Sequence, residues 1–135
     1  MTNEKLELAD NALANLQSMD ANQFNDPIDR RGFAKCLSSI AGLLSNEESR
    51  KSQASQAAHM GVSEAKRLVN EFPDNTDFLF NLADCLAMQG QQLLWWGEHN
   101  EDCFEAYQSC ISLLLELDKK IRPVRLKWRQ VGMLA

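Results

Sequence analysis

The residues best suited to nucleophilic, redox or metal chemistry in this sequence are four cysteines and two histidines. They are Cys36, Cys85, Cys103, Cys110, His59 and His99. No two cysteines have the two-residue separation of a zinc or dithiol motif, and neither histidine has a metalloprotease partner at the required spacing. Each cysteine lies within an apolar pattern of helical period, which favours packing in a core. We therefore expect no metal site.

Motifs for phosphate binding and acyl transfer are absent from the sequence as well. The six glycines form no dinucleotide-binding, phosphate-binding or nucleophile-elbow motif. Asp77 and Asp84 are seven residues apart, so they share one face of a helix, but an exposed acidic face explains this more simply than acid–base catalysis. The sequence predicts a protein that is not an enzyme, with no catalytic residue and no cofactor.

The elements that position these residues are expected to be helices. Apolar residues recur at spacings of three and four along nearly the whole chain, without the alternation of a half-buried strand. About six helices are expected: one over residues 3–17, a second after the cap Asn25-Asp26-Pro27, a third opened by a capping box at Ser45–Glu48, a fourth after Pro73, a fifth from Asn100 and a last after Pro123. The fifth has the broadest apolar band and is expected to be the most buried.

Composition and charge limit the function classes. The 135 residues suffice for one packed domain, and 44% of them are hydrophobic. A formal charge of −5 makes nucleic acid an unlikely partner for the whole surface. No apolar stretch approaches the roughly 20 residues of a membrane span, and the first residues lack a secretory pattern, so a cytoplasmic protein is expected.

An internal repeat appears when the chain is shifted by 45 residues against itself. The shift places Phe33 on Phe78, Leu37 on Leu82, Leu68 on Leu113, Glu71 on Glu116 and Phe72 on Leu117. Small residues also coincide with small residues. A period of this length is typical of stacked helical hairpins, and it predicts one domain over 1–135 with units at about 31–75 and 76–120 and flanking helices at 3–17 and 121–134.

The second unit resembles the tetratricopeptide repeat family. Its first helix has Leu79, Leu82-Ala83 and Leu86 at the family's large and small positions, and its second helix has Cys103, Tyr107 and Cys110 at the corresponding places. The resemblance covers roughly residues 30–120. It implies a right-handed stack of antiparallel helical hairpins, a TPR-like solenoid, that acts as a scaffold module binding a protein or peptide segment.

In that family, the first helices of successive hairpins line the peptide-binding surface. The matching positions in this chain are Lys35, Ser39, Leu43, Asp77, Phe80, Asp84 and Met88. Phe80 and Met88 are less polar than a solvated face requires, so we expect them to be central contacts. Lys35, Asn81 and Arg122 also overlap places used by family members that clamp a terminal carboxylate.

Two further possibilities follow from the same patterns. The first is a structural or oligomerisation bundle whose apolar stripes are all covered internally, with no open groove. The second concerns the two ends of the chain: residues 1–29 contain six acidic side chains and one base, whereas residues 119–135 contain six bases and no acid. The acidic first helix of one chain is therefore a candidate partner for the basic last helix of another, giving a homo-oligomer.

Overall fold

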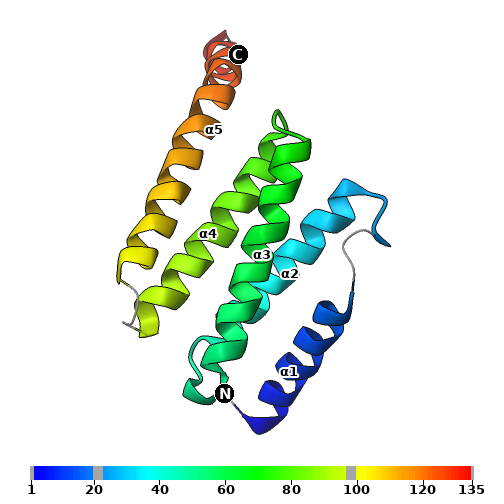
Figure 1. The fold of residues 1–135 in the computed structure, drawn as a ribbon. Coiled ribbons are helices and arrows are strands. Elements are labelled where there is room, and N and C mark those ends of the chain that lie inside the picture. Colours follow the sequence, from blue (N-terminus) through cyan, green and yellow to red (C-terminus); the bar gives the residue numbers. More distant parts are fainter. Residues whose placement is uncertain (1, 20–22, 97–99, 135) are drawn as a thin grey trace.

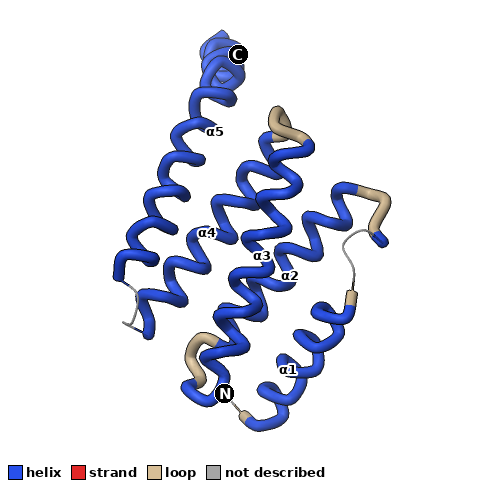
Figure 2. The backbone as a smooth tube through the Cα atoms, in the orientation of Figure 1, coloured by secondary structure: helices blue, strands red, loops and turns tan. Residues whose placement is uncertain are grey.

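The computed structural model describes the backbone of residues 2–19, 23–96 and 100–134, and the side chains of residues 2–19, 23–94 and 101–122. Its elements are α1 (Asn3–Ser18), α2 (Pro27–Leu44), the short 3₁₀ helix η2 (Glu48–Arg50), α3 (Lys51–Glu71), α4 (Thr76–Trp96) and α5 (Asn100–Leu134). Within the described backbone there is no strand (Figure 2). The prediction of an all-α fold is confirmed.

Two predicted helix starts have the expected caps. The Asp26 carboxylate accepts a hydrogen bond from the Ile28 amide at 2.9 Å, and Pro27 occupies the first turn of α2, where its missing N–H costs no helical hydrogen bond. The side chain of Asn75 accepts from the Phe78 amide at 3.0 Å and opens α4 in the same way. These local signals were sufficient to locate both helices.

The predicted capping box at Ser45–Glu48 is wrong. The Ser45 hydroxyl donates to the carbonyl of Ala41, so Ser45 closes α2 instead of opening the next helix. The chain then forms η2 before α3 begins at Lys51. A serine can bond to the turn behind it as readily as to the turn ahead, and spacing alone does not distinguish the two.

The predicted sixth helix is also wrong. α5 continues through Pro123 to Leu134, so the chain has five α-helices among the described residues, and no separate helix occupies 121–134. Proline removes one backbone hydrogen bond and crowds the preceding turn, but a long helix can continue past it.

The helices lie side by side in the order of the chain (Figure 1). The most extensive contacts join α2 to α3 and α4 to α5, which form two helical pairs. α4 also packs against both α2 and α3, while α1 packs on α2. In consequence α1 and α5 lie at opposite flanks of the molecule (Figure 1).

The core extends through the array as two clusters. The first joins α1 to α2 and α3, and it includes the fully buried Leu37 and Leu44. The second joins α3, α4 and α5 around Ala34, with Leu82 and Cys110 among its members. Because α2 and α3 contribute to both clusters, burial is continuous from the first helix to the last.

Two ion pairs join elements that are far apart in the sequence. Arg50 donates from Nε to both carboxylate oxygens of Asp10, at 2.9 and 3.0 Å, and so ties α1 to η2. Arg30 pairs with Glu71 and ties the start of α2 to the end of α3; this bond lowers the pKa of Glu71. One acid of the acidic first helix is thus engaged within its own chain.

α5 is more exposed than the sequence predicted. Phe104, Ile111, Leu114 and Leu115 are all exposed, and only one side of the helix packs on α4. The expectation that α5 would be the most buried helix is wrong. Its apolar band is broad because it covers two faces, and only one of them has a neighbour among the described residues.

Candidate functional site

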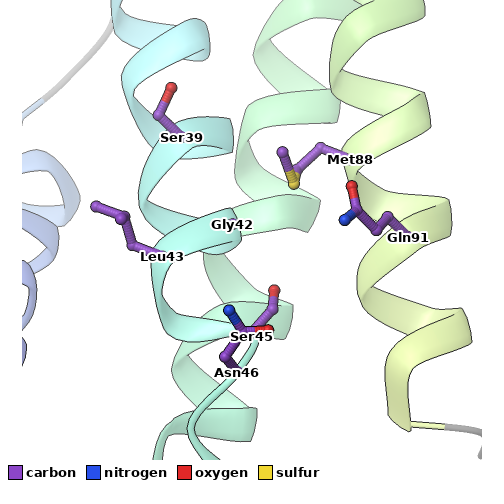
Figure 3. Close-up of a pocket in the computed structure, with 7 residues that line it drawn as sticks. All are labelled: Ser39, Gly42, Leu43, Ser45, Asn46, Met88 and Gln91. Carbon is purple, nitrogen blue, oxygen red and sulfur yellow. The ribbon is translucent and has the colours of Figure 1, made fainter. Parts of the chain in front are cut away.

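A pocket of about 490 Å³ lies between the second half of α2 and the second half of α4 (Figure 3). Its lining residues are Ser39, Gly42, Leu43, Ser45, Asn46, Met88 and Gln91. This volume falls within the range of pockets that hold small ligands or single peptide side chains. All seven lining residues are uncharged, so the pocket offers apolar contact and neutral hydrogen-bonding groups.

A glycine on α2 allows the close approach of Met88 that forms one side of the pocket. A Cβ at Gly42 would stand 3.1 Å from both Sδ and Cε of Met88, so the absence of a side chain lets Met88 lie against α2. Figure 3 shows Met88 and Gln91 extending from α4 toward α2, while Leu43 points away from α4 on the other side of Gly42. The floor is therefore flexible and apolar, as suits a thioether that adapts to different side chains.

Both walls continue beyond the pocket as regular helical stripes. On α2, Lys35, Ser39 and Gly42 recur at spacings of four and three, and Asn46 follows in the turn after the helix. On α4, Phe80 shares a stripe with Gln91 about 16 Å further along the axis. Phe80 is 52% exposed, although its side chain is large and apolar. An extended segment lying over the pocket would therefore meet a second apolar contact on α4.

Three of the nine predicted binding residues line this pocket: Ser39, Leu43 and Met88. Lys35, Asp77, Phe80 and Asp84 are exposed on the same two helices, outside the pocket. The structure brings together Ser39, Leu43 and Met88 at the pocket, whereas Phe80 and the charged members of the predicted set lie outside its lining.

The residues of the predicted carboxylate clamp do not gather at the pocket. Arg122 lies on α5 and pairs with Asp118 on the same helix at 2.5 Å, and the separate last helix that was predicted to carry it does not form. Asn81 is 6% exposed, and its amide nitrogen is buried without a hydrogen-bond partner among the described residues. Lys35 is the one member of the three exposed on the α2 wall.

Sequence reasoning missed four lining residues: Gly42, Ser45, Asn46 and Gln91. Gly42 could have been found, because it continues the helical stripe begun by Lys35 and Ser39, and Asn46 follows four residues later in the turn after α2. Ser45 was assigned to the next helix by the mistaken capping box. No sequence signal shows that Met88 packs against Gly42, since that contact depends on how closely α2 and α4 approach.

A second hollow surface lies over α4, between α3 and α5. It contains two adjoining pockets of about 330 and 500 Å³ that share Lys66, Leu86, Glu105 and Ser109. Asp102 and His59 line the smaller one. This surface is charged where the pocket between α2 and α4 is neutral, so the two would select different ligands.

The cysteines pack between helices. Cys103 donates from Sγ to the Gly90 carbonyl at 3.2 Å, and Cys110 donates to that of Ala83 at 3.3 Å, so both thiols bond to the facing helix. Burial raises the pKa of Cys85 to about 11 and also raises that of Cys110, which keeps both thiols protonated near neutral pH. Cys36 differs from the prediction because it is exposed on α2.

Over the described residues, no group of three or more histidine, cysteine or carboxylate side chains is arranged to hold a metal ion. In the same part of the chain, no helix has both the length and the apolar content needed to cross a bilayer. Comparisons of the chain with protein-family models, with curated proteins and with solved structures find no match. The pocket between α2 and α4 and its surroundings are therefore the features on which a function can be proposed.

Proposed function

We propose that this protein is a non-catalytic scaffold module, built as a TPR-like stack of helical hairpins, that binds a peptide or protein segment across α2 and α4. The observation that carries the proposal is the uncharged pocket around Gly42 and Met88, flanked by the exposed Phe80 on the α4 wall. Two first helices of successive pairs meet there, which is where the family resemblance would place a ligand.

The lining specifies the chemistry of the segment. Met88 offers apolar contact for one side chain, Leu43 adds an apolar group at the rim, and Ser39, Asn46 and Gln91 offer neutral donors and acceptors for peptide groups. A terminal carboxylate would need a cation at the pocket, and none of the seven lining residues is charged. We infer an internal segment with a bulky apolar side chain for the pocket and a second apolar group for Phe80.

The test is selection of binders from a displayed library of random linear peptides, followed by affinity measurements on the recovered sequences. Leu43→Asp places a charge at the rim, and we expect it to weaken the selected peptides by at least about tenfold, since a buried unpaired charge is costly. Leu8→Asp is the matched control, because Leu8 is 69% exposed on α1, outside the lining residues of this pocket. It should leave the affinity within about twofold of the original.

Salt dependence separates this proposal from the carboxylate clamp. Binding through a neutral pocket should change little between about 0.05 and 0.5 M salt, whereas a clamp built on Lys35 should weaken clearly. The proposal is wrong if no peptide is recovered, or if the recovered peptides bind the Leu43→Asp variant as tightly as the original protein. A large loss of thermal stability in Leu43→Asp and Phe80→Ala, without binding, would instead support the structural bundle whose stripes are covered internally.

A further inference from the structure

α5 lies at the flank of the molecule (Figure 1), and its outer face carries an apolar stripe. Phe104, Ile111 and Leu115 are 63%, 57% and 60% exposed, although their side chains are large and apolar. Cys103, Cys110 and Leu117 point to the opposite side and are buried. The helix therefore has two apolar faces, and its outer one is distinct from the proposed peptide site on α2 and α4.

The outer stripe has the spacing of a coiled-coil seam. Its members, at alternating steps of three and four, are Glu101, Phe104, Gln108, Ile111, Leu115, Asp118 and Arg122. Six of the seven are exposed and Asp118 is partly buried. A repeat averaging 3.5 residues keeps one seam facing a partner helix over its whole length, here about 32 Å.

The two ends of this seam carry side chains of opposite charge. It begins with Glu101, has Ile111 and Leu115 at its middle and ends with Arg122. An antiparallel second copy would place Ile111 against Leu115 of the partner subunit, and Phe104 against Arg122 of the partner subunit. A parallel copy in register would instead place Glu101 on Glu101 of the partner subunit and bring like charges together.

The flanking positions agree with the same register. Glu105 would lie beside Lys119 of the partner subunit, and this pair occurs twice because the arrangement is symmetric. Leu114, which is 42% exposed, would meet its own counterpart at the two-fold axis. The central apolar positions and the flanking charges are thus complementary in a single arrangement.

We propose that two copies of this chain associate through α5 in an antiparallel pair centred between Ile111 and Leu115. The occupant of the exposed face is a second copy, because the flanking charges Glu105 and Lys119 face each other across two copies only when the copies are antiparallel. This arrangement forms a closed dimer. It differs from pairing of the acidic first helix with the basic end of another chain, which would give an open series of increasing mass.

The test is a charge exchange between positions 105 and 119, followed by light scattering coupled to size-exclusion chromatography. Each single variant, Glu105→Lys or Lys119→Glu, creates two like-charge contacts, and we expect it to raise the dimer dissociation constant by about tenfold or more. The double variant restores both pairs with their signs exchanged, so it should recover the original dissociation constant within about threefold.

Glu48→Lys is the control for these variants, because it makes the same change of charge at an exposed position of η2, outside α5. It should leave the dimer intact. Within one chain, positions 105 and 119 are about 21 Å apart along the helix, so rescue by the double variant requires two molecules.

Three results would overturn the proposal. A monomer of 15.3 kDa at all concentrations up to about 200 µM would show that no self-association occurs. Failure of the double variant to rescue would show a different register or orientation. A mass that increases with concentration beyond that of a dimer would indicate the head-to-tail assembly instead. In that case, reversing the charges on α1 should abolish the increase.

Discussion

Replacing Leu37 by alanine is expected to lower the free energy of unfolding by about 3 to 5 kcal/mol. The Leu37 side chain is fully buried on α2, in the cluster that joins α1, α2 and α3. Removing three carbon atoms there loses the transfer free energy of burial and leaves a cavity that close-packed helices cannot fill completely. Urea denaturation followed by circular dichroism measures the change.

Leu43→Ala is the control on the same helix. Leu43 is 51% exposed at the rim of the pocket, so the same substitution should cost no more than about 1 kcal/mol. If both substitutions destabilise the protein equally, Leu43 is a core residue in solution and the α2–α4 face is covered. That outcome would contradict the fold as well as the proposed site.

Gly61→Leu is the second substitution with a large expected effect. A Cβ at Gly61 would stand 3.2 Å from the Ala34 carbonyl oxygen and 3.3 Å from the Ser38 amide nitrogen, which are both backbone atoms of α2. Backbone cannot move aside as a flexible side chain can, so a leucine must push α2 and α3 apart. We expect a loss of about 3 kcal/mol in the free energy of unfolding, at the upper end for overpacking.

Gly32→Leu isolates the steric part of this effect. A Cβ at Gly32 on α2 would have no atom within 4 Å of it, so leucine there gains helix propensity without a clash and should leave stability unchanged or higher by about 0.5 kcal/mol. The melting temperature should fall clearly for Gly61→Leu, and it should stay the same or rise slightly for Gly32→Leu. Similar losses in both would mean that the close approach of α2 and α3 does not exist.

The fold could be predicted from the sequence wherever its determinants are local. Asp26 before Pro27 and Asn75 before α4 specify helix starts through hydrogen bonds within three residues, and the periodic apolar residues identify the buried faces. The errors arose where one local signal has two outcomes. Ser45 bonds backward instead of forward, and Pro123 lies within a helix instead of before one.

The candidate site could be predicted only in part, for a different reason. Ser39, Leu43 and Met88 were found because their helical positions place them on first helices of the repeat. The pocket itself depends on the approach of Met88 to Gly42, which is a distance between helices, and sequence periodicity does not report such distances. The prediction for Arg122 assumed that a new helix begins near Pro123. Because α5 continues as a single helix, Arg122 lies on α5 instead.

The most direct test of the peptide-binding proposal is amide chemical-shift mapping of the isotope-labelled protein with a selected peptide. If the proposal is right, the largest changes centre on Ser39, Gly42, Asn46, Met88 and Gln91, with smaller changes near Phe80. Changes that centre on Lys66 and Ser109, in the charged surface between α3 and α5, while α2 remains unperturbed, would contradict it.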